Sequence, residues 1–338
     1  MLTTVRGLLV LALLAVGTVP AAAGPVKHWA EFPGREIRAI ALRGDLAGES
    51  YATVVPAADG WIYVRGKGGL YRLLGTDGTS AKSAAFDWCD DGQSKAVVRY
   101  ATPAFACVAK NFIIEIKDGV QYRRALPRPA WNDPHDVYTF DYPFVTWIDR
   151  EAGGRWWFSY GYARGLGYSD ASGSTRLVHL RGIPPVRTIA RAGNDLYLAA
   201  DGCVLARVRA MRVQGRTQLC ASPIAPQLIA AGGFVWVLTY GTTVERRDAR
   251  GRSRRWNLSG VAVNDVAYDA ASGTAYLLGG DSSRHNVLVT IGHDDVPHAK
   301  RLPMTGGSRI AVDRRGRIWI TSPFEHSLVA IAPAGSWG

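Results

Sequence analysis

The side chains of this sequence that best suit chemistry near neutral pH are histidines with acidic residues close by. An imidazole changes its charge around neutral pH, and a carboxylate beside it can orient it for proton transfer. The histidines concerned are His135, His285 and His326. These histidines lie in the segments WNDPHDVYTF, GGDSSRHN and SPFEHS. The polar residues close to them in these segments are Asp133, Asp136, Asp281, Arg284 and Glu325. This set could support proton abstraction or bind a divalent cation, with His285, His326 and Glu325 as the base and its orienting acid.

Three more polar residues lie where a ligand could be held: Tyr240, Asn264 and Asp265. Polar residues are common in loops, so ordinary solvated roles for all of these side chains stay open. The sequence contains no GxSxG, HExxH, phosphate-binding loop or nucleotide-binding fingerprint. A metal site and a catalytic role are therefore hypotheses that rest on the histidines and their acids alone.

The elements that must position these residues are short β-strands. Runs rich in Val, Ile, Tyr and Trp alternate with Gly, Asp and Asn, and helix signals are nearly absent beyond the N-terminus. One unit recurs, in which an apolar strand and a Gly- or Asp-containing turn precede a strand with a central aromatic residue. Its copies begin at Tyr51, Ala104, Phe144, Val186, Gln227, Val263 and Ser308.

The centres of the second strands follow one another at intervals of roughly 40 residues, which suits a four-stranded propeller blade. These centres are Tyr63, Ile113, Trp157, Tyr197, Trp236, Tyr276 and Trp319. We therefore predict an all-β chain that forms a seven-bladed β-propeller with four-stranded blades. The last blade lacks a fourth strand, and we expect Val26 to Phe32 to supply it, because closing the ring removes exposed sheet edges.

The aromatic residues at these centres are predicted to pack between neighbouring blades, where large flat side chains fill the space between sheets. In such a ring, the loops that link blades and the loops between second and third strands lie on one common face. The histidines, their acids and the three other polar residues all fall in those loops. We expect them to share that face, since binding groups often sit on loops that a rigid scaffold holds.

Four cysteines predict two disulfides: Cys89, Cys107, Cys203 and Cys220. Sequence neighbours are the natural pairs. A hairpin centred between Met211 and Arg212 would place Cys203 opposite Cys220, close enough to be bridged. Cys107, on the inner strand of blade two, would pair with Cys89.

The first 23 residues have the features of a secretory signal, with Arg6 ahead of an apolar run from Leu8 to Val16 and three alanines at Ala21 to Ala23. We expect residues 24–338 to form one propeller domain that is exported to the periplasm or secreted. The formal charge is +12, from 40 Lys and Arg against 28 Asp and Glu. This excess favours anionic partners, although genome composition alone could explain the Arg content. Export argues against a nucleic acid partner.

The last repeat resembles those of virginiamycin B lyase and of the wider NHL-type propellers. The turn Asp313 to Gly316 (DRRG) matches their D-x-x-G turn, and Ile318 to Thr321 (IWIT) matches their aromatic strand. The resemblance implies the propeller fold and, in the lyases, metal-assisted base chemistry with His and Glu on one face. Those repeats commonly have Glu where this chain has Ser322. Asn264 and Asp265 faintly resemble a cation-ligand motif of gluconolactonase-like propellers.

Two functions follow as hypotheses. In the first, the chain is a non-enzymatic, monomeric module that binds an envelope protein, a glycan or a small molecule through the loop face. In the second, it is a lyase or hydrolase similar to virginiamycin B lyase. No cofactor is expected in the first case, and a divalent cation is possible in the second.

Overall fold

The computed structural model describes residues 27–28, 34–44, 53–56, 62–66, 69–73, 79–82, 98–101, 104–109, 112–117, 120–126, 147–151, 153–159, 166–239, 241–307, 309–322 and 327–334. Every regular element among them is a β-strand, and the strands form seven sheets. The predicted all-β class is confirmed. No helix in this part of the chain is long and apolar enough to cross a membrane.

Five of the sheets consist of four consecutive strands, each antiparallel to the next. The first contains β8 (Val98–Ala101), β9 (Ala104–Ala109), β10 (Phe112–Lys117) and β11 (Val120–Ala125). The second contains β12 (Trp147–Arg150), β13 (Trp156–Ser159), β14 (Leu166–Ser169) and β15 (Thr175–Leu177). The third contains β16 (Val186–Ala192), β17 (Asp195–Ala200), β18 (Val204–Arg209) and β19 (Arg212–Gln218). The fourth contains β20 (Gln227–Ala231), β21 (Phe234–Leu238), β22 (Thr243–Arg247) and β23 (Ser253–Asn257). The fifth contains β24 (Ala262–Asp269), β25 (Thr274–Gly280), β26 (His285–Ile291) and β27 (Pro297–Thr305).

The other two sheets have a fifth strand at their outer edge. One contains β4 (Thr53–Pro56), β5 (Ile62–Gly66), β6 (Gly69–Leu73) and β7 (Thr79–Lys82), with β3 (Arg43–Gly44) parallel to β7. The other contains β28 (Arg309–Val312), β29 (Ile318–Ser322) and β30 (Ser327–Pro333), then β2 (Arg35–Ala41) and β1 (Lys27–His28).

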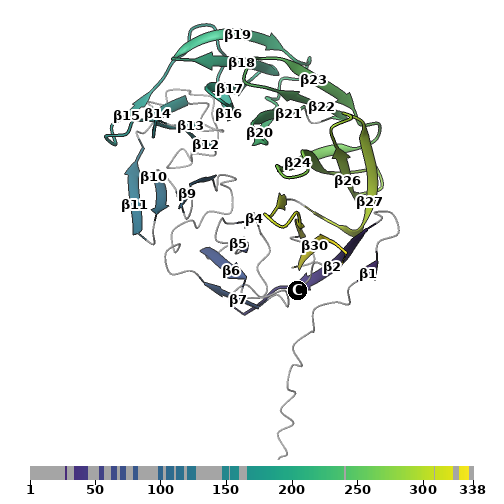
Figure 1. Cartoon of the computed structure of the whole chain (residues 1–338). Helices are drawn as coiled ribbons and strands as arrows, with labels where there is room; N and C mark the ends of the chain where they lie inside the picture. The colour runs from purple at the N-terminus through teal and green to yellow at the C-terminus, as the bar shows by residue number, and fades with distance from the viewer. Residues whose placement is uncertain are drawn as a thin grey trace, which may run out of the picture.

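The sheets are arranged around a common centre, with the fourth strands β11, β15, β19, β23 and β27 on the outside (Figure 1). The first strands of neighbouring sheets contact one another from β8 and β12 through β16, β20, β24 and β28 to β4. This is the propeller-like arrangement of four-stranded antiparallel sheets that the repeats predict. It places all first strands at the inner end of their sheets.

The strand that completes the last sheet lies further along the chain than predicted. Arg35–Ala41 pairs with β30 along its whole length, whereas Lys27–His28 pairs only with β2, so the assignment of Val26 to Phe32 to this position is wrong. A strand next to β30 must pack against apolar groups on both of its faces. Ile37 and Ile40, three residues apart, are buried in two separate clusters. The segment VKHWAEF cannot place aliphatic side chains in both.

The sheet of β8 to β11 also differs from the prediction by one strand. Val98–Ala101 is its first strand and contacts β12, so Ile113 on β10 lies on the third strand and Cys107 on β9 lies on the second, not the inner, strand. Two adjacent apolar strands, AFACVA and FIIEIK, look equally like the start of a repeat. The preceding strand VRYA is too short and too polar to stand out in the sequence.

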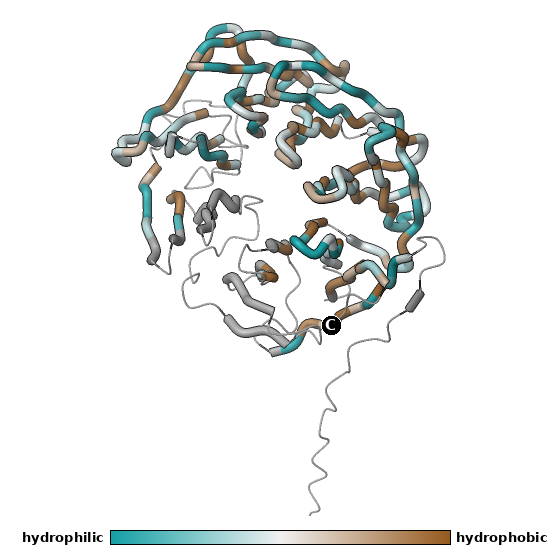
Figure 2. The backbone as a smooth tube through the Cα atoms, in the orientation of Figure 1, coloured by the Kyte–Doolittle hydropathy of each residue, from teal (hydrophilic) through white to brown (hydrophobic). Residues whose placement is uncertain are grey.

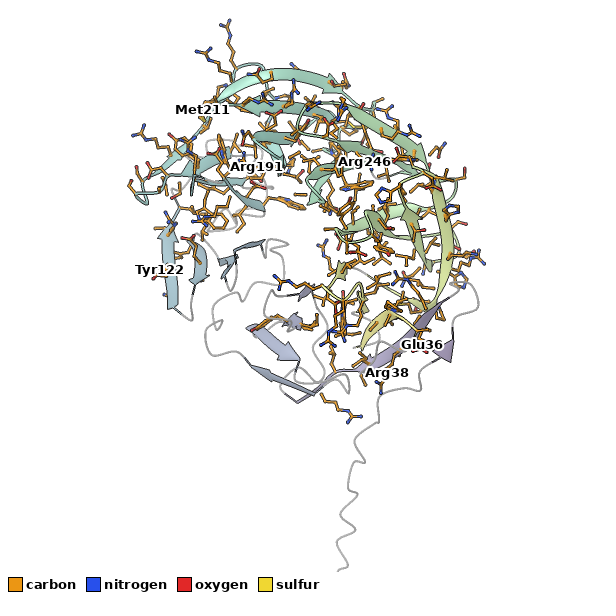
Figure 3. All side chains as sticks on the ribbon, in the orientation of Figure 1. Glu36, Arg38, Tyr122, Arg191, Met211 and Arg246 are labelled. Carbon is orange, nitrogen blue, oxygen red and sulfur yellow. A yellow bond between two sulfur atoms is a disulfide. The ribbon has the colours of Figure 1, made fainter. Side chains whose placement is uncertain are left out.

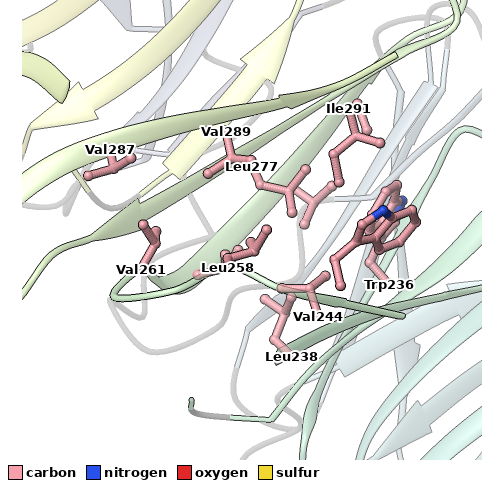
Figure 4. Close-up of a cluster of buried hydrophobic side chains, with 13 residues drawn as sticks. Trp236, Leu238, Val244, Leu258, Val261, Leu277, Val287, Val289 and Ile291 are labelled. Carbon is pink, nitrogen blue, oxygen red and sulfur yellow. The ribbon is translucent and has the colours of Figure 1, made fainter. Parts of the chain in front are cut away.

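The aromatic side chains of the second strands pack between sheets, as predicted. Trp236 lies in a buried cluster with Val287, Val289 and Ile291 of the next sheet (Figure 4). Trp319 packs with Val54, Ile62 and Val64 across the junction where the chain's first and last sheets meet. Brown, apolar segments accordingly lie along the strands in the interior, while the outer strands alternate with teal (Figure 2). The core therefore consists of the spaces between consecutive sheets.

The disulfide between Cys203 and Cys220 is present, with a Cα–Cα distance of 5.6 Å. The hairpin turn lies one residue earlier than predicted, since Ala210 and Met211 adopt positive φ angles and Arg209 faces Arg212. A β-bulge near Arg207 shifts the register back. Cys203 and Cys220 therefore meet just beyond the end of the β18–β19 ladder, as predicted. Cys89 lies outside the described residues, so the pairing of Cys89 with Cys107 stays a prediction.

Replacing both Cys203 and Cys220 by Ala should lower the free energy of unfolding by about 3 kcal/mol, because a closed loop of this size restricts the unfolded chain. The sequence separation is 17 residues. Urea denaturation of the double variant, compared with the oxidised wild-type protein, measures the effect. A change below about 0.5 kcal/mol would mean that the β18–β19 hairpin holds the two ends together without the bond.

Candidate functional site

The structure describes only some of the residues that the sequence predicts for a site on the loop face. Asn264, Asp265, Asp281, Arg284 and His285 lie in the described part of the chain. The remaining predicted residues lie outside it: Asp133, His135, Asp136, Tyr240, Glu325 and His326. The proposed meeting of His285 with His326 and Glu325 therefore stays a prediction.

Asp281 organises the turn between β25 and β26. One carboxylate oxygen, Oδ1, accepts hydrogen bonds from the backbone N–H groups of Ser283 at 2.9 Å and His285 at 3.0 Å. The other, Oδ2, lies 2.9 Å from the Arg301 guanidinium of β27. The His285 imidazole, about half exposed, has Nδ1 3.6 Å from Oδ1. Asp281 and His285 thus form an acid–imidazole pair, but the carboxylate is already committed to the turn and to Arg301.

These contacts set the protonation of Asp281. Partial burial raises its pKa, but the backbone hydrogen bonds from His285 and Ser283 and the charge of Arg301 outweigh burial, so the pKa lies below its ordinary value. A lowered pKa stabilises the folded state above the ordinary carboxyl range, and this contribution is lost as the pH falls through the folded-state pKa. Asp281 is therefore an anchored anion that holds the turn between β25 and β26.

Asp281→Asn should destabilise the protein at neutral pH, and its difference from the wild type should shrink as the pH is lowered below about 4. Chemical denaturation of both proteins from pH 7 to pH 2.5 checks this expectation. Asp294→Asn, on a more exposed turn of the same sheet, is the matched control. A difference that stays constant over the whole range would show that the charge of Asp281 plays no part in stability.

Asn264 and Asp265 belong to a series of links between neighbouring sheets. Asp265 is buried and accepts a hydrogen bond from the backbone N–H of Ile310 in β28 at 3.0 Å. The backbone carbonyl of Asn264 accepts from the side chain of Gln227 in β20 at 3.4 Å. Two further links of this kind are Thr188 Oγ1 to Pro226 O at 3.1 Å and Ser159 Oγ to Arg187 O at 3.0 Å. These contacts connect neighbouring sheets. The carboxylate of Asp265 takes part in them, whereas Asn264 takes part through its backbone carbonyl.

The carboxylates buried inside the sheets are occupied as well. Glu115 accepts from Arg124 Nε at 2.7 Å and from Trp156 Nε1 at 2.8 Å. Asp313, in the turn shared with the lyase-like repeats, accepts from Arg317 Nε at 2.7 Å and from Trp319 Nε1 at 3.0 Å. No group of three or more His, Cys, Asp or Glu in the described ranges is arranged to hold a metal ion. A cation site that uses the remaining histidines is untested.

On five of the seven sheets, charge is separated radially, which the linear sequence does not reveal. The fourth strand of the last sheet, β2, contains Glu36 and does not follow this pattern. The outer strands β11, β15, β19, β23 and β27, hereafter the basic outer strands, contain no Asp or Glu. Their charged side chains are Arg123, Arg124, Arg176, Arg212, Arg216, Arg254, Arg255, Lys300 and Arg301. The side chains drawn around Met211 and Tyr122 project outward, whereas Arg191 and Arg246 lie between sheets (Figure 3).

Several cations of the basic outer strands face solvent. All seven residues of β19 are exposed, and Arg176 and Lys300 are exposed on their own strands. Among the described carboxylates, none forms an ion pair with Arg212, Arg216 or Lys300 closer than 4.0 Å. By contrast, Arg124, Arg255 and Arg301 reach inward to Glu115, Glu245 and Asp281. Part of the cationic charge neutralises internal acids, and part remains available to a partner.

The fold provides the basis for comparison with known proteins. No protein-family model matches the chain, and no curated protein matches its sequence. Among solved structures, a streptogramin B lyase is similar with a TM-score of 0.67 and 12% identity, over 88% of this chain and 97% of that one. The virginiamycin B lyase of Staphylococcus aureus is similar with a TM-score of 0.65 and 12% identity, over 88% and 99%. The chain has the fold of the virginiamycin B lyases.

Other propellers share this fold without an enzymatic description. The extracellular domain of a one-component system from B. thetaiotaomicron is similar with a TM-score of 0.59 and 15% identity, over 88% of this chain and 39% of that one. Similarity at this identity shows the fold, and one fold hosts many functions. Ser322, which stands where the lyase-like repeats commonly have Glu, pairs with Ser327 at the end of the β29–β30 ladder. The function must be argued from the surfaces of this chain.

Proposed function

We propose that the chain is an exported, seven-bladed propeller that acts as a binding module for an anionic partner. Each of the seven sheets would form one blade, and the pairing of β2 with β30 would close the ring. The N-terminal 23 residues would direct export. The Cys203–Cys220 disulfide supports this location, because such bonds persist in oxidising compartments.

The basic outer strands carry the proposal. These strands carry cations on five successive sheets and contain no carboxylate. They therefore produce a positive potential along the part of the circumference that the five sheets form. Arg supplies most of these cations, and its planar guanidinium binds carboxylate, sulfate and phosphate groups through two parallel hydrogen bonds. Of the described acids predicted on the loop face, Asp265 and Asp281 are engaged within the protein. The outer circumference is therefore the better candidate for a partner.

A pair of charge-matched variants tests this function. The outer-strand variant carries Arg176→Gln, Arg212→Gln and Lys300→Gln, and the turn variant carries Arg250→Gln, Arg284→Gln and Arg314→Gln, all at exposed positions. With dextran sulfate as the probe at low salt, the outer-strand variant should bind about 100-fold more weakly than the wild type, at about 1 kcal/mol for each lost cation. The turn variant, with the same net charge, should change less than about threefold. Equal losses in both variants would reduce the effect to net charge and refute the proposal.

A lyase or hydrolase activity is the second candidate, and the similarity in fold to streptogramin and virginiamycin B lyases favours it. It would use His285 with Glu325 and His326. Elemental analysis of the purified protein and a lyase assay with a cyclic depsipeptide, before and after chelation, address this candidate. A stoichiometric divalent ion together with activity that chelation removes would support it. Absence of activity under both conditions would remove it.

A further inference from the structure

We infer that the anionic partner is a flexible acidic polysaccharide that lies along the circumference and contacts several sheets at once. This inference rests on the proposed function and specifies its partner. The observation behind it is how the cations are distributed. They are not gathered on one sheet but recur on the fourth strand of five consecutive sheets, β11 through β27, which lie side by side around the outside (Figure 1).

The convex shape of this surface disfavours a lipid bilayer. A plane can touch only a small sector of a ring's circumference, so most of these cations would face away from it. The exposed large apolar side chains point the same way. Tyr122, Leu177, Val213 and Val296 lie on or beside four different outer strands, Met211 lies in the turn before β19, and Ile224 lies between β19 and β20. Single apolar residues scattered in this way are ordinary surface features, whereas membrane insertion requires a contiguous apolar patch.

The same geometry disfavours nucleic acids. Duplex DNA is stiff over about 150 base pairs, so it cannot follow a surface that curves within one protein domain without a large bending cost. Single strands bend easily, but proteins that bind them stack the bases on exposed aromatic side chains. Among the residues whose side chains the structure describes, Tyr122 is the one large aromatic residue that is exposed. A polysaccharide needs neither a straight path nor stacking platforms.

Each outer strand contributes a weak contact, and a long chain adds them together. Arg176 on β15, Arg212 and Arg216 on β19, and Lys300 on β27 are exposed cations on three different sheets. One exposed ion pair in water contributes little. When a polymer has bound one sheet, however, its next anionic groups are held near the neighbouring sheet at a high effective concentration. Affinity should therefore rise steeply once the polymer is long enough to reach a second and third outer strand.

A length series of polygalacturonate oligomers tests the inference on the full mature chain. Per mole of carboxylate, long polymers should bind on the order of 10–100-fold more tightly than oligomers that reach one sheet. A one-sheet variant, Arg212→Gln with Arg216→Gln, should keep most of this gain, and the outer-strand variant should lose most of it. Vesicles of phosphatidylglycerol and duplex DNA, at matched anion concentration, should compete poorly.

The outcomes separate this inference from the proposed function. If the outer-strand variant binds dextran sulfate more weakly than the turn variant does, but polygalacturonate affinity per carboxylate is independent of length, the surface binds anions and the multi-sheet inference is wrong. Stronger binding to the vesicles or to duplex DNA than to long polygalacturonate would also overturn it. If both charge-matched variants bind every probe alike, the proposed function itself fails.

Discussion

Truncating Ile37 and Ile40 to Ala is expected to cost roughly 4–10 kcal/mol of folding free energy, at 2–5 kcal/mol for each buried isoleucine. The two side chains lie in separate clusters, Ile37 with residues of β24 to β30 and Ile40 with residues of β4, β5 and β28 to β30, so their costs should add. A loss of this size equals most of the stability of an ordinary domain. The double variant should therefore unfold at or near room temperature.

Urea denaturation followed by tryptophan fluorescence measures the effect, with Ala39→Ser as a control, because Ala39 is exposed on the same strand. The control should change stability by less than about 0.5 kcal/mol. The result matters because β2 is far from β30 in sequence and joins the two ends of the chain. A double variant as stable as the control would mean that the fold does not depend on this pairing.

The second large effect concerns the tryptophans between sheets. Trp236→Ala should cost about 3–5 kcal/mol, because the indole is fully buried and stacks on Trp256 with ring centroids 5.8 Å apart. A phenylalanine at this position should be tolerated much better. The Nε1 of Trp236 has no hydrogen-bond partner in the structure, so replacing the indole by a phenyl ring loses no hydrogen bond.

Trp319→Phe is the informative comparison, because Trp319 Nε1 donates to the Asp313 carboxylate at 3.0 Å. Losing a hydrogen bond to a charged group adds about 1.5–3 kcal/mol to the packing cost. Trp319→Phe should therefore destabilise the protein more than Trp236→Phe does, in thermal and urea denaturation alike. The reverse order would contradict the hydrogen-bond assignments of these two buried rings.

The sequence predicts the repeat well because each unit depends on local features. The turn Asp313 to Gly316 and the strand around Trp319 belong to one hairpin. The strands that contain Tyr197 and Trp236 each form a hairpin of their own with the strand before them. The sequence does not locate the strand next to β30, because its position depends on a contact between the chain's two ends. Alternation alone does not distinguish REIRAIA from VKHWAEF. The burial of Ile37 and Ile40 distinguishes the two segments, and this burial depends on sheets that are distant in sequence.

The candidate site could be predicted less well. Asp281 and His285 are adjacent as the loop sequence suggests, but the sequence does not show that Arg301 and two backbone N–H groups occupy the carboxylate. Asp265 is buried and accepts a hydrogen bond from Ile310 of the neighbouring sheet, a contact that the sequence does not show. The sequence does not bring the basic outer strands together, because their cations are spread over the chain from Arg123 to Arg301. The segments RSRR and VQGRTQ indicate a cationic outer surface once they are recognised as parts of fourth strands.

The salt dependence of polyanion binding tests the central claim most directly. Counterion release makes the logarithm of the binding constant fall linearly with the logarithm of salt concentration, with a slope of about 0.7–0.9 per neutralised charge for nucleic acids. With dextran sulfate, the outer-strand variant should show a slope about 2–3 units shallower than the wild type, because three contacting cations are gone. The turn variant should keep the wild-type slope. If the two variants have the same slope, the basic outer strands are not the binding surface.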